Sequence, residues 1–333
     1  MSQQSLFGPP QSVTHKFNLD SARKLPKNIH FGTSSWTYPG WQGSIYHRSY
    51  KSERQFNADS LSEYCEFPWF STVGIDSTFY GPPAVSTLQR YQSCVPKNFR
   101  WVSKVWEEVT IPVYGRHPRY GAKAGKPNPH FLNAEVFVNK FLSRYIDAGV
   151  LDNTGPFVFQ FQALPKREAS SPQSFIERLD SFLAQLPQDF NYATEVRNQE
   201  ILVPEYFSAL SRHNVTHCFN HWTSMPPLVD QMKAAAAGGG IGASFLTSRI
   251  LTPIGVSYQQ AVERFTPYDS IKIIQEQMRA DVARLAKRAV QRAIPVYVLV
   301  NNRCEGYAPG TIDAIGSEIV ENLDEWLEES ADE

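Results

Sequence analysis

Residues 192–219, YATEVRNQEILVPEYFSALSRHNVTHCF, contain the pattern that decides the fold. The segments Tyr192–Val196 and Val215–Phe219 are short and rich in β-branched and aromatic residues, which is typical of buried strands. Between them, residues 204–213 show the helical spacing of apolar side chains. Strands that alternate with helices need crossover connections, so we predict that these two strands are parallel.

The same alternation continues on both sides of this unit, from Ile29 to near the end of the chain. Eight strands that alternate with helices are the number that closes a (β/α)8 barrel, which commonly takes about 250 residues. We therefore predict an α/β fold with a single TIM-like barrel over residues 29–330, and a doubly wound open sheet is the alternative. Helical spacing is clearest over residues 175–186, 271–289 and 312–327. The expected strands are Ile29–Thr33, Thr72–Asp76, Phe99–Lys104, Pro156–Gln160, Tyr192–Val196, Val215–Phe219, Ile241–Thr247 and Pro295–Val300.

Both ends of the chain differ from this pattern. Residues 1–28 are polar, lack periodicity and contain three prolines, so we expect an extended or poorly ordered arm. Residues 313–333 contain nine acidic and no basic residues, which predicts an acidic, solvated face on the last helix. Because the whole chain has a formal charge of −1, the rest of it carries a net charge of +8. That excess favours an anionic partner.

Composition excludes several classes of protein. With 42% hydrophobic, 13% aromatic and 20% charged residues, the chain can form a real core and is neither disordered nor a coiled coil. No run approaches the ~18 apolar residues of a membrane span, so we expect no membrane partner. The four cysteines are scattered singly, which is typical of reduced thiols in a cytoplasmic protein.

Polar and charged residues gather at the expected carboxyl ends of the strands. In a TIM barrel the chemistry lies on the loops that follow the strands, and charges there are costly to desolvate without a partner. We predict that Glu195, Lys104 and Asp76 are catalytic, with Glu195 as the general acid or base. The alternative for the small polar residues is that they cap helices and loops. The expected substrate-binding residues are Ser34, Trp36, Tyr38, Tyr80, Gln160, Arg197, Arg249, Asn301 and Asn302.

Glu195 and Arg197 are two residues apart on one strand, so their side chains point to the same face. They form either a structural ion pair, or a pair in which Arg197 keeps Glu195 ionised or binds an anionic substrate. Asp76 and Glu195 as a carboxylate pair for glycoside chemistry is a weaker alternative.

Metal and cofactor chemistry have little support in the sequence. His213, His217 and His221 would line one helix face, but Val215–Phe219 is predicted as a strand, and this removes the ligand spacing. There is no glycine-rich nucleotide motif and no G-x-S-x-G elbow, so we expect no metal and no cofactor.

Anion binding has better support. A long loop after the third strand carries four basic residues and no acidic one between Val109 and Ala134. After the eighth strand, residues 306–311 lead into the last helix, whose N-terminal amides would attract an anion. The basic residues of the loop are Arg116, Arg119, Lys123 and Lys126, through which a nucleic acid could also bind.

Several motifs are similar to those of the YecE-like domain-of-unknown-function family, whose members are TIM-barrel-like proteins. The resemblance covers residues 29 to about 315, and it implies a barrel and a site without naming a reaction. The motifs are His30–Trp41 (HFGTSSWTYPGW), Val73–Tyr80 (VGIDSTFY), Phe99–Lys104 (FRWVSK), Gly155–Gln160, Thr194–Arg197 and Asn301–Pro309 (NNRCEGYAP).

The chain departs from the family pattern at several positions. Gly74 replaces the glutamate of the second motif and Asp76 its asparagine, while Leu251 stands in a histidine position. Arg303 replaces the aspartate that often follows the paired asparagines. If the family's activity needs that glutamate or histidine, the resemblance implies a changed or lost activity here.

The first hypothesis is therefore a barrel enzyme, a hydrolase, isomerase or lyase, that acts on a small anionic or hydroxylated substrate such as a sugar phosphate or carboxylate. The second is a nucleic-acid-binding protein or phosphodiester hydrolase, which rests on fold analogy with barrel endonucleases. The third is a barrel that binds its ligand without catalysis.

Overall fold

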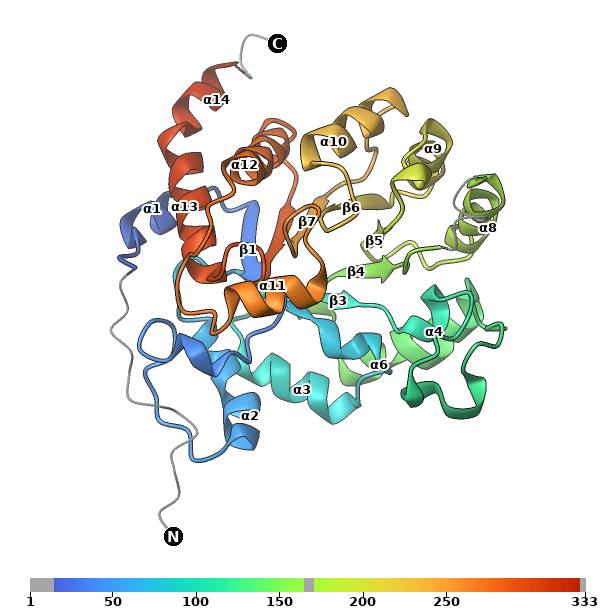
Figure 1. Ribbon diagram of the computed structural model, residues 1–333, viewed down its shortest axis with the longest axis horizontal. Helices are drawn as coiled ribbons and strands as arrows, with labels where there is room; N and C mark the ends of the chain where they lie inside the picture. The colour runs from blue at the N-terminus through green and yellow to red at the C-terminus, as the bar shows by residue number, and fades with distance from the viewer. Residues whose placement is uncertain (1–14, 165–170, 330–333) are drawn as a thin grey trace.

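The computed structural model describes residues 15–164 and 171–329. Its strands form one eight-stranded parallel sheet in the order β1-β8-β7-β6-β5-β4-β3-β2, which curls into a nearly closed barrel (Figure 1). The predicted α/β TIM-like fold is confirmed. The strands are β1 Ile29–Thr33, β2 Thr72–Ile75, β3 Arg100–Lys104, β4 Thr154–Gln160, β5 Tyr192–Glu195, β6 Thr216–His221, β7 Leu246–Ile250 and β8 Val296–Val300.

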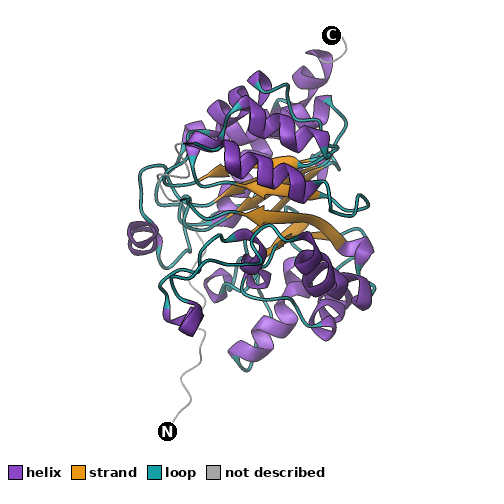
Figure 2. Ribbon diagram, turned by 90° about the vertical axis from the view of Figure 1, so that its right-hand side faces the viewer, coloured by secondary structure: helices purple, strands orange, loops and turns teal. Residues whose placement is uncertain are grey.

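Helices surround the strands, as Figure 2 shows from the side. They alternate with the strands along the chain, which is what parallel strands require. The helices are α1 Leu19–Lys24, α2 Glu53–Tyr64, α3 Val85–Cys94, α4 Glu107–Thr110, α5 Ala134–Val136, α6 Ser143–Ala148, α8 Gln173–Leu183, α9 Pro204–Arg212, α10 Leu228–Ala237, α11 Tyr258–Phe265, α12 Glu276–Gln291, α13 Ala308–Glu321 and α14 Leu323–Glu329.

Two apolar clusters hold the barrel together. A large one lies between the strands and the helices, and a small one fills the barrel interior. The interior cluster includes Val102 of β3, Val158 of β4 and Leu299 of β8, all buried. The polar residues of the candidate site lie next to this interior cluster, at the carboxyl ends of the strands.

A side chain bridges the seam between β1 and β2, the one pair of neighbouring strands in the ring with no ladder of its own. The hydroxyl of Tyr64, from α2, accepts a hydrogen bond from Thr33 N (2.9 Å) and donates one to Thr72 O (3.1 Å). The strands approach closely here, because a Cβ on Gly32 would lie 1.9 Å from Thr72 O. Glycine at 32 and the Tyr64 hydroxyl thus close the barrel.

The seventh strand differs from its expected position at Ile241–Thr247. Gly239 and Gly240 adopt positive φ angles of 93° and 85°, and the chain continues as a loop before β7 begins at Leu246. The strand β7 contains polar residues that point into the barrel, so its sequence lacks the apolar pattern of the other strands. For this reason the predicted strand begins five residues before β7. Arg249 therefore lies within the strand and not after it.

Two of the expected helices also differ in extent. The stretch at 271–289 becomes a helix only from Glu276, and Ile274 is exposed. The stretch at 312–327 is interrupted at Asn322, between α13 and α14.

Residues 15–28 are not the extended arm that was expected. They contain α1, and Phe17 packs edge-on against Phe67 with ring centroids 4.8 Å apart. The buried Asp313 of α13 bonds the His15 ring at 2.8 Å and accepts a hydrogen bond from Asn18 N at 2.7 Å. Asp313 is thus an exception to the solvated acidic face expected of the last helix. The rest of the predicted arm, residues 1–14, lies outside the described residues.

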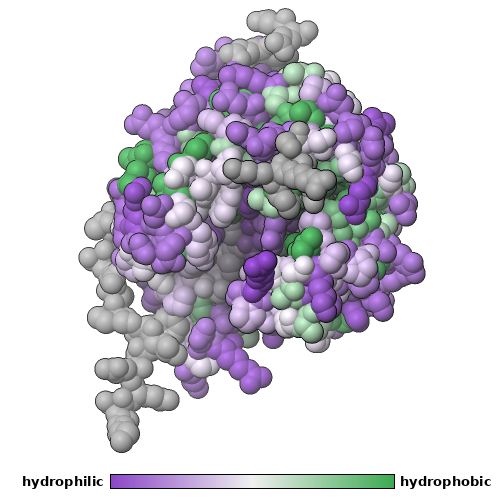
Figure 3. Space-filling view, turned by 45° about the vertical axis from the view of Figure 1, so that its right-hand side comes forward, coloured by the Kyte–Doolittle hydropathy of each residue, from purple (hydrophilic) through white to green (hydrophobic). Residues whose placement is uncertain are grey.

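Within the described ranges, none of the helices combines the length and apolar character needed to traverse a lipid bilayer. On the face shown in Figure 3, hydrophobic residues form small separate patches among hydrophilic ones. All four cysteines are unpaired, as predicted.

Candidate functional site

Most of the predicted charged residues converge on one cavity of about 420 Å³ at the carboxyl ends of the strands. They reach it from different strands because inward-pointing residues at the ends of parallel strands meet on the barrel axis. Beneath the lining, Glu195 is fully buried. The cavity is lined by Asp76, Tyr80, Lys104, Gln160, Gln162, Ala163, Arg197, Trp222, Arg249, Leu251, Tyr258 and Arg303.

Arg249 is the centre of an ionic network. One of its terminal nitrogens donates to both carboxylate oxygens of Asp76, at 3.0 and 2.9 Å. The other donates to Glu195 Oε2 at 2.7 Å and to Gln160 Oε1 at 3.2 Å. One guanidinium therefore joins groups from β4, β5 and the end of β2.

Glu195 is held between two arginines. It pairs with Arg197, as the spacing of the two residues predicts, and also with Arg249. Burial alone would raise the pKa of Glu195, but the two guanidiniums hold it below its ordinary value. Glu195 is fully buried and does not line the cavity, whereas Arg197 does, so this arrangement favours a positioning role for Glu195 over the predicted acid–base role.

Lys104 is the cation of the network that lacks a carboxylate partner. Its Nζ lies 4.2 Å from the ring centroid of Phe79 and has no hydrogen bond or ion pair within the described residues. Burial lowers the pKa of Lys104 to about 8, although Asp76 opposes the shift. The side chain therefore changes charge close to physiological pH.

Arg197 also keeps an unused donor. Its guanidinium lies 4.3 Å from the ring centroid of Trp222, and one terminal nitrogen donates to Gln160 Oε1 at 3.2 Å. The other terminal nitrogen, Nη1, is buried and has no hydrogen-bond partner among the described residues. A guanidinium donor that is buried without an acceptor is costly.

Five of the predicted binding residues do not line this cavity: Ser34, Trp36, Tyr38, Asn301 and Asn302. Asn301 Oδ1 accepts from Arg303 N, and Asn302 Oδ1 accepts from Ala308 N, so both stabilise the loop before α13. This is the capping alternative, and it also satisfies an amide at the N-terminus of α13 that was expected to attract an anion. Ser34 is buried beside β8, and Tyr38 packs against Trp41 with centroids 5.0 Å apart.

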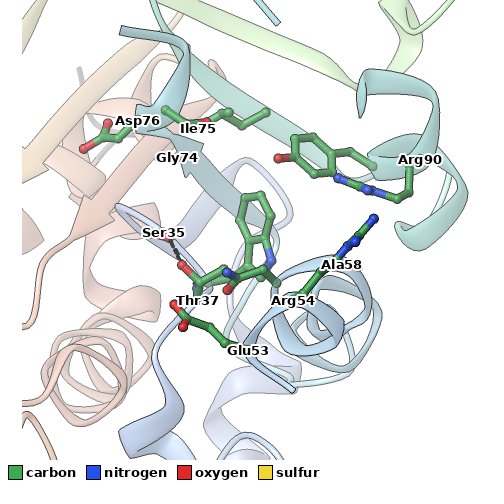
Figure 4. Close-up of a pocket in the computed structure, with 13 residues that line it drawn as sticks. Ser35, Thr37, Glu53, Arg54, Ala58, Gly74, Ile75, Asp76 and Arg90 are labelled. Atoms are coloured by element: carbon green, nitrogen blue, oxygen red, sulfur yellow. Dashed lines mark hydrogen bonds between the residues drawn. The ribbon is translucent and has the colours of Figure 1, made fainter. Parts of the chain in front are cut away.

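Trp36 lines a second cavity, of about 600 Å³, between α2, α3 and the end of β2. Figure 4 shows Arg54 of α2 and Arg90 of α3 at the same side of this cavity, with Asp76 at the other end. Asp76 therefore borders both cavities. The two arginine side chains are exposed.

Sequence reasoning missed several residues of the cavity. Trp222 follows β6 directly and Arg303 lies just after β8, so their positions after strands were the available signal. Tyr258 comes from α11 and lies 4.6 Å from the Arg303 guanidinium, a contact for which the sequence offers no signal.

Two neighbouring carboxylates neutralise part of the positive charge of the basic loop after β3. Arg119 pairs with Glu107 at 2.6 Å, and Lys123 pairs with Glu108 at 3.3 Å. Both carboxylates precede the stretch that was counted as free of acidic residues. Arg116 and Lys126 are exposed, so they remain available to an anionic partner.

The three histidines of the 213–221 run bond to different protein groups. The ring of His213 bonds to Asp180, that of His217 to Tyr206 and Gln231, and that of His221 to Gln275. Among the described residues, no three His, Cys, Asp or Glu side chains are grouped as metal ligands would be.

A family model described as "Protein of unknown function DUF72" matches residues 30–331, which is nearly the whole chain. The chain belongs to the DUF72 family. This is the YecE-like family indicated by the sequence motifs. A comparison with curated proteins finds no match.

Solved structures of DUF72 proteins share the fold. A DUF72 family protein from Enterococcus faecalis V583 has a TM-score of 0.57 and 15% sequence identity, with 89% of this chain and 95% of that chain covered. One from Thermotoga maritima MSB8 has a TM-score of 0.52 and 16% identity, with 89% and 99% covered. At these identities, the likeness extends to the fold alone.

The structure gives a physical reason for one departure from the DUF72 motifs and places two others at the cavity. A Cβ on Gly74 would lie 3.0 Å from Ser34 O, so the backbone here leaves little room for the family's glutamate. Leu251 and Arg303 both line the cavity at the carboxyl ends of the strands, where the family's aspartate in place of Arg303 would make the cavity less basic.

Proposed function

We propose that this DUF72 protein is a barrel enzyme that binds a small anionic substrate, such as a sugar phosphate or a carboxylate, in the cavity at the end of the barrel. The observation that carries the proposal is that Lys104 and Arg197 line the cavity, while Lys104 Nζ and Arg197 Nη1 have no acceptor among the described residues. A carboxylate or phosphate would supply the missing acceptors.

The charges of the site support the same assignment. Asp76 and Glu195 face three cations, Lys104, Arg197 and Arg249, so the network has an excess positive charge. Arg303 adds a further cation at the cavity. In a partly buried site the charge of a bound anion would offset this excess at little desolvation cost to the protein.

The positions of these side chains suggest a different role for each of them. Arg197 and Gln160 orient the anion, Lys104 exchanges the proton, and Glu195 positions both arginines. Tyr80 is 65% exposed and forms part of the outer wall, where the Arg119 guanidinium lies 5.0 Å from its ring centroid. A cavity of this size, with its guanidiniums largely buried, suits a small ligand better than a nucleic-acid backbone.

A thermal-shift screen of sugar phosphates, dicarboxylates, nucleotides and a short oligonucleotide tests the proposal. A ligand at 100 times its Kd stabilises the folded state by about 2.7 kcal/mol, which is readily measured. We expect small anions to raise Tm in the wild-type protein and not in Lys104→Met, whereas Lys126→Met, a change on the exposed loop, keeps the response.

The pH dependence of binding adds a second readout. Because the pKa of Lys104 is about 8, its ammonium form predominates below that pH. Anion affinity should therefore fall as the pH rises through about 8, and this step should vanish in Lys104→Met. A Tm response to the oligonucleotide alone, with steep salt dependence and loss in Arg116→Glu, would instead support the nucleic-acid hypothesis.

A further inference from the structure

Lys104 has the surroundings of a nucleophilic amine. It is the last residue of β3, and its side chain lines the cavity at the carboxyl ends of the strands. Its Nζ lies 4.2 Å from the centroid of the Phe79 ring. The two carboxylates of the network, Asp76 and Glu195, are engaged by arginines. No hydrogen bond holds Nζ within the described residues, so it is free to meet a ligand.

The charges around Lys104 act in opposite directions. Asp76 and Glu195 favour its ammonium form, while Arg249 and Arg197 disfavour it. Burial is the largest effect, and it lowers the pKa to about 8. A substantial fraction of the side chain is therefore the neutral amine at mildly alkaline pH, which is the form that attacks a carbonyl carbon.

We propose that Lys104 forms an imine with a small carbonyl compound that also carries a carboxylate or phosphate group. The proposal rests on the anion-binding function given above and names the substrate class of that site. Arg197, whose Nη1 donor is unused, holds the anionic group, and Lys104 lines the same cavity.

The covalent step balances without any further reactant. The Nζ lone pair forms a bond to the carbonyl carbon, and one amine proton passes to the carbonyl oxygen to give a carbinolamine. The second amine proton leaves with that hydroxyl group as water, and a carbon–nitrogen double bond remains. Asp76, whose side chain is 37% exposed, is the carboxylate at the cavity that can relay these protons.

Reductive trapping tests the proposal on the full-length protein. Pyruvate, glyoxylate and dihydroxyacetone phosphate are each incubated with the protein and sodium cyanoborohydride, and the modified lysines are mapped by peptide mass spectrometry. We expect labelling of Lys104 to saturate with concentration and to exceed labelling of the exposed Lys126 by about tenfold or more. The labelling rate should rise as the pH passes through about 8.

Lys104→Arg is the matched variant, because it keeps the positive charge and removes the nucleophile. We expect it to lose labelling at position 104, while labelling of Lys126 stays as in the wild-type protein. Labelling of Lys126 as fast as Lys104 with all three compounds would overturn the proposal. Equal labelling by neutral dihydroxyacetone would overturn its anionic part.

Failure of the imine and failure of anion binding give different results. If sulfate raises Tm but none of the three compounds labels Lys104, the imine is excluded and the anion site stands. If Lys104 is labelled selectively while neither sulfate nor phosphate raises Tm, the nucleophile stands and the proposed anion-binding function fails.

Discussion

At the scale of single residues, two side chains of the same chemical type have different environments at the cavity. Asp76 and Glu195 are both carboxylates bonded to Arg249, but the Asp76 side chain is 37% exposed and Glu195 is fully buried. Of the two, only Asp76 lines the cavity. The weaker alternative of a glycosidase carboxylate pair needs both groups to reach the sugar, and this burial does not fit it.

Replacing Glu195 with glutamine should destabilise the protein. The change removes the charge that compensates Arg197 and Arg249, and breaking a buried pair costs about 3–5 kcal/mol. Urea denaturation at pH 7 measures the loss. Asp76→Asn is the control, and its cost should be smaller because solvent screens its partly exposed pair.

The same variant should lose its effect in acid. The pKa of Glu195 is lower in the folded state than its ordinary value of 4.5, so its ionised form stabilises the fold. That stabilisation is present above the ordinary pKa and disappears as the pH falls through the folded-state pKa. The difference between wild type and Glu195→Gln should therefore shrink below pH 4.5, and an unchanged difference would contradict this account.

At the scale of elements, the seam between β1 and β2 shows how a helix completes a sheet. The Tyr64 hydroxyl serves one amide of β1 and one carbonyl of β2, where paired strands would bond directly. The Thr33 hydroxyl lies 3.0 Å from the same oxygen. Closure of the ring at this point keeps Asp76, at the end of β2, within reach of Arg249.

Tyr64→Phe removes this bridge and leaves two buried backbone groups unsatisfied. We expect a loss of about 1–3 kcal/mol in the free energy of unfolding. Tyr192→Phe is the matched control, because the Tyr192 hydroxyl is buried without a hydrogen-bond partner in the described chain. Equal effects of the two variants in urea denaturation would show that the seam bridge carries no stability.

At the scale of the whole molecule, Asp313 joins three segments that are distant in sequence. One carboxylate oxygen accepts from Trp69 Nε1 and from Asn18 N, both at 2.7 Å, and the other bonds the His15 ring at 2.8 Å. This fixes residues 15–28 and the loop before β2 to α13.

Asp313→Ala should release this contact. The loss of a buried carboxylate with three hydrogen bonds should cost about 3 kcal/mol or more and expose the segment around α1. Limited trypsin digestion should then cleave at Arg23 or Lys24 faster than in the wild-type protein, while Asp20→Ala, on the exposed side of α1, leaves the rate unchanged. Unchanged cleavage in Asp313→Ala would contradict the role given to this carboxylate.

The sequence by itself determined the architecture and half of the residues that line the cavity. The spacing of apolar residues and the lengths of the apolar segments predict eight strands and their helices. Strands such as Tyr192–Glu195 and Val296–Val300 are buried on both faces, and this leaves a strong apolar pattern in the sequence. The position of polar residues after strands then predicts Asp76, Lys104, Gln160, Arg197 and Arg249, since parallel strands deliver their ends to one place. β7 is the exception, because its inward-facing polar residues remove that apolar signal.

Only the tertiary structure decided which charges are paired. In the folded chain, Glu195 pairs with two arginines and Arg119 pairs with Glu107. Asn302 bonds the first amide of α13, and Lys104 has no hydrogen-bond or ion-pair partner among the described residues. The reason is physical, since a pKa and a free donor depend on burial and on neighbours within a few ångströms. Those neighbours come from strands and loops far apart in the chain, and their distances are not written in the sequence.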